Sequence, residues 1–368
     1  MPVLPGRVLM TADAVGGVWT YALELARGLA ARGTSVMLAT MGPPPDENQR
    51  RDALCIPGLE LFTGDYRLEW MEEPWEDVRR AGEWLLGLER QHAPDVIHLN
   101  NYCHGALPFR APVLVVGHSC VTSWWNAVRG CEAPREWDRY RAEVARGLAA
   151  ARMVTAPSRA MLDSLETHYG PLRAGRVIPN GRAPAWGSQP RKQPFLFASG
   201  RVWDDAKNIA ALGRIAPALP WPVYIAGDTR HPDGGARGCP ECYCLGRLPS
   251  ERVPWWMGRA SIYVLPARYE PFGLSILEAA LAGCALVLGD IASLRENWDG
   301  AAVFVPPDDC EALQRAVASL IDSPTERSAL SARAQRRGAA FGRDRMAASY
   351  AEAYRELCAA RPPARAAG

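Results

Sequence analysis

Short apolar runs alternate with longer segments of helical period along most of the chain. The first run, residues 7–12, leads through a turn into residues 18–32, where Tyr21, Leu25 and Leu29 recur at helical spacing. Short apolar runs separated by helices are typical of parallel strands that are covered by helices on both faces. The pattern therefore predicts an α/β protein.

The apolar runs fall into two groups, which predicts two parallel sheets. Strands of the first sheet are expected at residues 7–12, 35–40, 96–99, 113–117 and 153–156. Strands of the second are expected at residues 195–199, 223–226, 262–265, 285–288 and 302–305. After the first group, Ser158 is a good N-cap for a helix that reaches about residue 169. At 177–181 a strand meets a turn, and a stretch that contains Pro, Gly, Gln and Lys then runs to about residue 194. This stretch is the expected linker between the two groups.

The size and composition of the chain agree with two domains. Its 368 residues are 48% hydrophobic and 22% charged, which is enough to bury two cores. We expect Rossmann-like domains in residues 1–182 and 183–342, followed by an amphipathic helix within 343–368.

Charge and hydropathy exclude several classes of partner. A net charge of +2 is too small for a surface that follows nucleic-acid phosphates. Arg7 and Asp13 interrupt the first apolar stretch, which argues against a secretion signal, and the longest apolar stretch, 279–289, is shorter than the roughly 20 residues that cross a bilayer. The arginines of residues 132–152 are balanced by acidic residues, so membrane contact is at most peripheral. We expect a cytoplasmic protein.

The ten cysteines do not form a regular disulfide framework, and reduced thiols are expected. Cys239, Cys242 and Cys244 are the exception, because the first two have metal-ligand spacing. The second C-x-x-C pair of a zinc site is absent. We therefore favour a surface loop over a zinc site, and we expect no metal and no cofactor.

The segment from Glu270 to Glu278, E-P-F-G-L-S-I-L-E, places one carboxylate before a predicted helix start and the other inside the helix. Pro271 suits a first helical turn and Gly273 has no side chain to block a ligand. The backbone N–H groups of Phe272, Gly273, Leu274 and Ser275 are then free to face an anion, such as a phosphate.

Two other interpretations of the carboxylates Glu270 and Glu278 are a catalytic pair of a glycoside hydrolase and an ordinary helix N-terminus. The two carboxylates resemble the acid and nucleophile of a glycoside hydrolase, but eight helical positions rise roughly 12 Å, whereas hydrolase pairs lie about 5 to 9.5 Å apart. An isolated pair of this kind is more often a helix N-terminus with favourably placed Glu residues.

The whole segment resembles the E-x7-E signature of retaining nucleotide-sugar glycosyltransferases of family 4, which have the GT-B fold. The resemblance implies two Rossmann-like domains that face each other across a cleft, with a closing helix that crosses back to the first. It also implies that Glu270 lies beside the donor sugar, that Glu278 binds the ribose hydroxyls, and that the amides between them contact sugar and phosphate.

Two cations follow the expected strand at 195–199. Arg201 lies directly after Gly200, and a polar loop leads into a predicted helix that carries Lys207 and Asn208. Fixed cations stabilise the negative charge that develops on a departing nucleoside diphosphate. Isolated residues of these types are more often solvated, but Arg201 and Lys207 match the paired Arg and Lys of the family.

Two features of the first domain are also expected near the ligand. Gly16 and Gly17 lie where the first strand meets its helix, and the family often carries such a pair beside the donor phosphates. His118 ends the strand expected at 113–117, where the family frequently has a His that reaches the donor sugar. His98 ranks lower as a residue of the same cleft. A tight turn and an ordinary loop histidine are the alternatives.

Aromatic residues gather near the same strand ends and suggest an acceptor site. The acceptor-side candidates are Trp19, Asn101, Trp124 and Trp125. Packing in the protein interior is the alternative for the tryptophans. The acceptor itself, whether a small molecule, a glycan or a lipid-linked hydroxyl compound, is not specified by the sequence.

Absent motifs narrow the function further. No G-x-G-x-x-G follows the first strand and no Gly-Lys pair is present, which argues against a dinucleotide oxidoreductase and a P-loop enzyme. No D-x-D occurs either, so we expect a metal-independent enzyme. We predict a retaining glycosyltransferase of the hexosyltransferase type. A nucleotide-sugar epimerase of the same fold and a non-catalytic nucleotide-sugar-binding protein are the alternatives.

Overall fold

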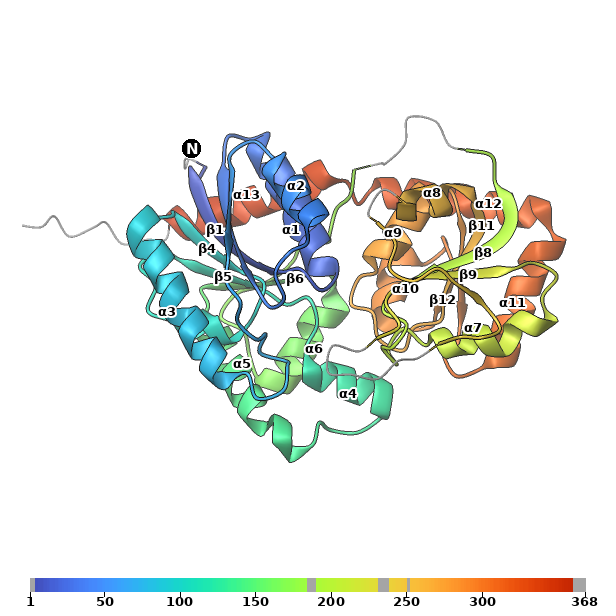
Figure 1. The fold of residues 1–368 in the computed structure, drawn as a ribbon, viewed down its shortest axis with the longest axis horizontal. Helices are drawn as coiled ribbons and strands as arrows, with labels where there is room; N and C mark the ends of the chain where they lie inside the picture. Colours follow the sequence, from blue (N-terminus) through green and yellow to red (C-terminus); the bar gives the residue numbers. More distant parts are fainter. Residues whose placement is uncertain (1–3, 184–189, 231–237, 250–251, 360–368) are drawn as a thin grey trace, which may run out of the picture. The chain divides into compact units, whose positions relative to one another are not determined.

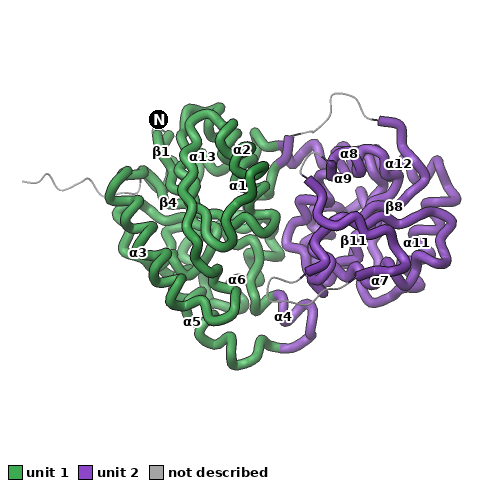
Figure 2. The backbone as a smooth tube through the Cα atoms, viewed as in Figure 1, with its two compact units in different colours: residues 1–123, 132–181, 343–368 green, residues 124–131, 182–342 purple. Residues whose placement is uncertain are grey.

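The computed structural model of the chain describes residues 4–183, 190–230, 238–249 and 252–359. The chain folds into two compact units (Figure 2). Unit 1 comprises residues 1–123, 132–181 and 343–368, and unit 2 comprises residues 124–131 and 182–342. Residues 124–131 lie in unit 2 although they fall within the expected first domain. Some segments with a predicted role lie outside the described residues. They are the two ends of the chain, residues 1–3 and 360–368, and residues 184–189 of the expected linker.

Unit 1 contains a seven-stranded, all-parallel sheet with the order β3-β2-β1-β4-β5-β6-β7 (Figure 1). Its strands are β1 (Arg7–Asp13), β2 (Ser35–Met41), β3 (Leu59–Thr63), β4 (Val96–Leu99), β5 (Val113–Val116), β6 (Met153–Ala156) and β7 (Gly175–Val177). The central strands β4, β5 and β6 are buried at every position. Each of these three strands was predicted from the apolar run in its sequence.

Helices cover this sheet. They are α1 (Gly17–Ala30), α2 (Glu47–Leu54), α3 (Trp75–His92), α5 (Asp138–Ala150), α6 (Arg159–Tyr169) and α13 (Arg343–Ala359), with short 3-10 helices at Cys103–Ala106 and Arg135–Trp137. Helix α4 (Val121–Arg129) is divided between the two units. Helix α13 packs closely against α1, because a Cβ at Gly28 would lie 2.5 Å from the Cβ of Ala347. The expected cap of α6 is present, since the Ser158 side chain accepts a hydrogen bond from Met161 N.

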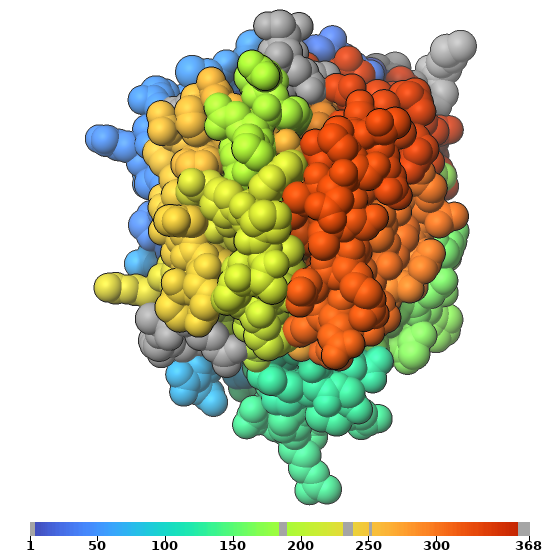
Figure 3. Space-filling model, turned by 90° about the vertical axis from the view of Figure 1, so that its right-hand side faces the viewer, coloured from blue at the N-terminus to red at the C-terminus, as the bar shows by residue number. Residues whose placement is uncertain are grey.

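Unit 2 contains a six-stranded, all-parallel sheet with the order β10-β9-β8-β11-β12-β13. Its strands are β8 (Gln193–Ser199), β9 (Val223–Ala226), β10 (Tyr243–Cys244), β11 (Ala260–Leu265), β12 (Ala285–Gly289) and β13 (Val303–Val305). Its helices are α7 (Ile209–Ile215), α8 (Arg252–Arg259), α9 (Leu274–Leu281), α10 (Ala292–Trp298), α11 (Cys310–Asp322) and α12 (Pro324–Ala339), with a 3-10 turn at Ala216–Ala218. Figure 3 shows the face of unit 2 on which α11 and α12, orange to red, form the surface.

The structure confirms the predicted α/β class with two parallel sheets. Strands β3 and β10 and most of β7 were not predicted. β3 and β10 are edge strands with several exposed positions, so they lack the continuous apolar run of a central strand. Within the described part of the chain, every helix is too short or too polar to span a bilayer.

Candidate functional site

The predicted donor residues of unit 2 follow the carboxyl ends of β8 and β11, where ligands bind in open α/β sheets. The backbone is tightly packed at this edge. Gly200 N donates to Ala226 O at 3.0 Å, and a Cβ at Gly227 would lie 1.7 Å from Gly200 O. Only glycine at position 227 allows the turn after β9 to lie this close to the turn that carries Arg201.

Lys207 and Glu270 form an ion pair in this region. The Lys207 Nζ lies 2.6 Å from Glu270 Oε2, and the two side chains are 16% and 13% exposed. The other carboxylate oxygen, Oε1, accepts a hydrogen bond from Gly273 N at 3.0 Å. Both oxygens of Glu270 are therefore held, one by a cation and one by a backbone amide. The sequence predicted each residue but not their pairing.

Helix α9 begins later than expected. Its first residue is Leu274, and Gly273 is the N-cap with φ 88°, a left-handed conformation that favours glycine. Pro271 and Phe272 precede the helix, so the prediction that Pro271 begins the first helical turn was wrong. Gly273 N is used by Glu270. The N–H groups at the start of α9, those of Leu274 and Ser275, still lie at the positive end of the helix dipole.

The side chain of Ser275 belongs to a buried hydroxyl cluster. Tyr263 of β11 donates to Ser275 Oγ at 2.8 Å, and its hydroxyl lies 3.1 Å from Ser199 Oγ. Burial raises the pKa of Tyr263, so its hydroxyl stays protonated and available as a donor. The cluster ties the ends of β8 and β11 to the first turn of α9.

Glu278, predicted as the ribose ligand, has a cationic partner. Arg182 Nε lies 2.8 Å from Glu278 Oε1, and the side chains are 26% and 21% exposed. Arg182 N donates to Phe341 O at 3.0 Å, and Arg182 forms an isolated parallel bridge with Gly342. Arg182 is thus anchored where the chain enters unit 2, beside the place where it leaves. Sequence reasoning missed Arg182.

Arg201 is held by an acidic residue that sequence reasoning also missed. Its Nη2 lies 2.7 Å from Oδ2 of the buried Asp204. The other Asp204 oxygen accepts from Trp124 Nε1 at 3.1 Å and from Ala206 N at 3.0 Å. Burial alone would raise the pKa of Asp204, but Arg201, Lys207 and these hydrogen bonds together hold it below its usual value. The spacing Arg201-x2-Asp204-x2-Lys207 was the available signal.

Lys207 and Asn208 precede helix α7, whereas the sequence placed both inside it. Asn208 is the N-cap in a left-handed conformation, with φ 54°. Its Nδ2 donates to Pro266 O at 3.0 Å and to Pro307 O at 2.6 Å. These bonds fix the turn that presents Lys207, and the left-handed residue stops the helix from extending backwards.

In unit 1, Gly16 and Gly17 lie at the start of α1, exposed, with Gly16 as the N-cap. The loop before them is fixed by Asp13, whose Oδ1 accepts from Val15 N at 2.9 Å. The helix therefore begins where a glycine pair leaves its amides uncovered by side chains.

His118 follows β5 and is half-buried. Its Nε2 lies 2.8 Å from Asn100 Oδ1, and its ring packs edge-on against Tyr21 with centroids 4.5 Å apart. Desolvation lowers the pKa of His118 to about 3, so the imidazole is neutral at physiological pH. His98 of β4 is fully buried and contacts Tyr354 of α13, with Nδ1 and the hydroxyl oxygen 2.7 Å apart.

The acceptor-side candidates are divided between the units. Trp19 is buried in α1, and the amide of Asn101 contacts Thr11 and His104 at 3.0 Å and 2.6 Å. The sequence suggested that Trp124 and Trp125 belong to the first domain. In the structure both residues lie in unit 2. Their rings contact each other edge-to-face, with centroids 5.8 Å apart.

The three residues of the cysteine motif differ in their exposure to solvent. Cys239 is buried, Cys242 is half-buried and Cys244 is exposed, and Cys242 N donates to Cys239 O in a tight turn. Among the described residues, no group of three or more His, Cys, Asp or Glu side chains is arranged to hold a metal ion.

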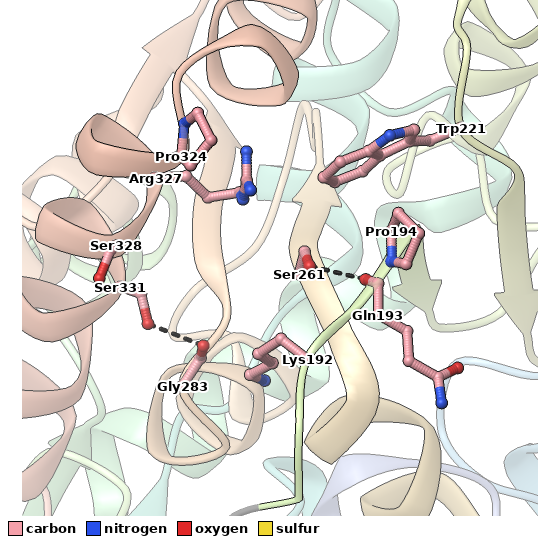
Figure 4. Close-up of a pocket in the computed structure, with 10 residues that line it drawn as sticks. All are labelled: Lys192, Gln193, Pro194, Trp221, Ser261, Gly283, Pro324, Arg327, Ser328 and Ser331. Atoms are coloured by element: carbon pink, nitrogen blue, oxygen red, sulfur yellow. Dashed lines mark hydrogen bonds between the residues drawn. The ribbon is translucent and has the colours of Figure 1, made fainter.

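A pocket of about 340 Å³ lies away from this site, at the amino ends of strands β8 and β11 of the unit 2 sheet (Figure 4). Gln193 and Ser261, at the starts of β8 and β11, line it together with residues of α12. The nearby Lys192 already donates to Ala282 O at 2.7 Å and to Met257 O at 3.1 Å. Its ammonium therefore satisfies the carbonyls of neighbouring helix ends.

Comparisons with known proteins agree with the geometry. Residues 15–185 match the family model described as Glycosyltransferase Family 4, and residues 193–323 match the one described as Glycosyl transferases group 1. D-inositol 3-phosphate glycosyltransferase of Thermobispora bispora is 33% identical over 94% of this chain and 91% of its own length. Glycogen synthase of Mycobacterium tuberculosis is 26% identical over 92% of this chain and 91% of its own length.

The fold also matches a solved structure. HepE of Anabaena in complex with UDP-glucose superposes with a TM-score of 0.72 at 16% identity, over 94% of this chain and 98% of that chain. The family models, the relatives and the two parallel-sheet units lead to the same conclusion: the chain belongs to the family 4 type of GT-B glycosyltransferases.

Proposed function

We propose that this glycosyltransferase moves a hexose from a nucleoside-diphosphate sugar to a hydroxyl acceptor, with retention of anomeric configuration and without a metal ion. The observation that carries the proposal is the Lys207–Glu270 pair, 2.6 Å long, directly before the N-terminus of α9. A cation, a carboxylate and a positive helix end lie together there. This set suits a sugar that develops positive charge and a diphosphate that develops negative charge.

Unit 2 binds the donor in this proposal. Lys207 has three N–H donors, so it can bond a phosphate oxygen while it keeps its contact with Glu270. Arg201, held by Asp204, supplies a second positive charge. The N–H groups of Leu274 and Ser275 supply the helix dipole. Together these groups stabilise the departing nucleoside diphosphate, and a metal ion is not needed for that charge.

Glu270 stabilises positive charge on the sugar and does not become glycosylated. Its two oxygens are bonded to Lys207 and Gly273 N, which fixes the carboxylate and lowers its nucleophilicity. The leaving phosphate then accepts the proton of the acceptor hydroxyl on the same face of the sugar, which retains the configuration. Glu278 binds the ribose, and the family resemblance gives His118, Gly16 and Gly17 a role in binding the donor.

The relatives support a broad range of acceptors. One relative is named for a phosphorylated inositol and another for glycogen, which favours a small molecule or a glycan as the acceptor. A lipid-linked hydroxyl compound is the third candidate. HepE binds UDP-glucose, which makes UDP-glucose the first donor to test.

The test is a thermal-shift panel of uridine, guanosine, adenosine and thymidine diphosphate sugars, followed by turnover assays with the best donor. We expect one donor class to raise the Tm and to be consumed in the presence of EDTA. The product from an α-linked donor should be α-linked by NMR. A β-linked product refutes retention, and loss of turnover with EDTA refutes metal independence.

Two further outcomes separate the alternatives. Conversion of the donor to an isomer without any acceptor indicates an epimerase. A donor that raises the Tm but is never consumed, across small-molecule, glycan and lipid-linked acceptors, indicates a non-catalytic binding protein. A glycosylated Glu270 trapped by mass spectrometry overturns the proposed role of that residue.

A further inference from the structure

The pocket at the amino ends of β8 and β11 has no part in the proposed function. It lies wholly within unit 2, and its walls come from the start of α12, the first residues of β8 and the segment before β9. Arg201 and Glu270 follow the carboxyl ends of β8 and β11, so the pocket lies at the other end of the same two strands. A volume of about 340 Å³ is at the lower end of the range for ligand pockets and suits a small molecule.

Two cationic residues, Lys192 and Arg327, line this pocket. Within the part of the chain that the structure describes, neither of them forms an ion pair with a carboxylate. Desolvation lowers the pKa of both side chains, so nearby negative charge does not offset the cost of removing these cations from water. A ligand of negative charge would supply that compensation.

Lys192 contributes its charge to the pocket but no hydrogen bond. An ammonium group has three N–H donors. Two of them bond Met257 O at 3.1 Å and Ala282 O at 2.7 Å, and the third is directed to Cys284 Sγ at 3.6 Å. All three donors are therefore used within the protein.

Arg327 is bonded on one side of its guanidinium group. Its Nη1 donates to Ile321 O at 3.1 Å and to Leu320 O, and both carbonyls lie at the carboxyl end of α11. These two bonds are an ordinary helix cap by a cation. No described residue bonds Nε or Nη2 of Arg327. Two parallel N–H groups of a guanidinium can bind two oxygens of one phosphate or carboxylate group.

Trp221 holds the guanidinium group of Arg327 without using any of its hydrogen-bond donors. Figure 4 shows Arg327 from α12 and Trp221 pointing toward each other at one end of the pocket. The Cζ of Arg327 lies 4.9 Å from the centroid of the Trp221 ring, which is a cation–π contact. Ser328, the next residue of α12, adds an exposed hydroxyl group to the same wall.

We propose that this pocket binds a small phosphate monoester, with its phosphate group on Nε and Nη2 of Arg327 and its polar remainder against Trp221 and Ser328. A phosphate monoester carries a charge of about −1.5 to −2 at pH 7, which matches the two positive charges of Arg327 and Lys192. A carboxylate carries a single negative charge and leaves one cation uncompensated. The site is separate from the donor site and does not depend on the proposed function.

The ligand class is tested by titration calorimetry on the full chain without a sugar donor. The probes are glycerol 3-phosphate, glucose 1-phosphate, glycerate and glycerol. We expect at least one of the two phosphate monoesters to bind, glycerate to bind at least about tenfold more weakly because of its smaller charge, and glycerol not to bind. If neither monoester binds at about 10 mM, which would fill a site of millimolar affinity, the proposal is wrong. Equal affinity for glycerate and the monoester refutes the preference for phosphate.

Two variants locate the bound monoester in the pocket. Arg327→Gln should weaken its binding at least about tenfold, because a charged pair of hydrogen bonds is lost. Ser328→Asp brings a negative charge to the wall of the pocket and should weaken binding to a similar extent. Because Ser328 is exposed, this variant decides the question even if Arg327→Gln does not fold. Arg333→Gln, which loses a bond to Gly300 O outside the pocket, is the matched control on α12 and should bind normally.

A donor-site variant and one NMR signal complete the test. Lys207→Ala should leave the affinity for the monoester unchanged, since Lys207 lies beyond the other ends of the strands. The indole N–H signal of Trp221, assigned with Trp221→Phe, should shift during the titration. If Lys207→Ala abolishes binding while Arg327→Gln and Ser328→Asp retain it, the monoester binds in the donor site and the pocket proposal is overturned. Equal losses in Arg327→Gln and Arg333→Gln would show unspecific attraction to positive charge.

Discussion

The guanidinium of Arg182 bonds the carboxylate of Glu278, with Nε and Oε1 2.8 Å apart. The two residues are 96 positions apart in the chain. Arg182 is in turn anchored through its backbone to Phe341 O. Glu278, the predicted ribose ligand, is therefore held by a residue at the point where the chain crosses into unit 2. An ion pair of this kind limits the rotamers of the carboxylate.

Arg182→Ala should weaken donor binding about tenfold, because Glu278 loses the contact that orients it. Titration calorimetry with the best donor measures the change. The losses in Arg182→Ala and Glu278→Ala should not add in the double variant, since both remove the same ribose contact. Arg176→Ala, which breaks an ion pair with Glu356 in unit 1, is the control and should leave the affinity unchanged. Fully additive losses would contradict the idea that Arg182 acts through Glu278.

Lys207→Ala should lower kcat roughly 10²- to 10³-fold, as expected when a fixed charge that stabilises the transition state is removed. The effect should fall on kcat more than on KM, because charge develops on the leaving diphosphate only as the sugar bond breaks. Steady-state kinetics measure both. Lys207→Arg should recover part of the activity, since it keeps the charge next to Glu270. A change in KM alone would assign Lys207 to ground-state binding.

The sequence predicted the fold well where strands are buried on both faces. β4, β5 and β6 are apolar at nearly every position, so their runs are visible without a structure. The edge strand β3 has only one buried position, and β10 consists of two exposed residues. Their pairing is decided by neighbouring strands. No local pattern reveals it.

The sequence predicted the site residues that lie in one short motif, Glu270 to Glu278, but not the partners that hold them. Trp124 and Asp204 are hydrogen-bonded across 80 positions of the chain, and Lys207 and Glu270 across 63. Spacing along one chain carries no information about such pairs. The start of α7 was misplaced for a related reason, because Asn208 is fixed by the carbonyls of Pro266 and Pro307.

His98 should make the protein less stable as the pH falls. Burial lowers its folded-state pKa to about 3 from an ordinary value of 6.5. Above pH 6.5 both folded and unfolded states are neutral, and between 6.5 and 3 only the unfolded state binds the proton. The free energy of unfolding should therefore fall by up to roughly 1.4 kcal/mol per pH unit on this account. Urea unfolding at pH 7, 6 and 5 measures it.

The matched variant for this prediction is His98→Gln, which keeps polar atoms near Tyr21 and Tyr354 but cannot titrate. It should be less stable than wild type at pH 7, and its stability should depend less on pH between 6.5 and 5. His118 adds a similar dependence and remains in both proteins, so the difference isolates His98. Parallel pH curves for the two proteins would show that His98 is protonated when folded.

Gly227→Ala should destabilise unit 2 severely, by at least about 3 kcal/mol, which is at the upper end for a single substitution. The new Cβ would lie 1.7 Å from Gly200 O, and neither atom can move without displacing the backbone that carries Arg201. Gly246→Ala is the control, since Gly246 has φ 68° and open space around its Cβ position. That variant bears only the left-handed strain of about 1–2 kcal/mol. Gly227 follows β9 and Gly246 follows β10, and Gly227 N donates to Gly246 O, so the two variants test neighbouring turns. Equal urea midpoints would show that the backbone relaxes around the added methyl group.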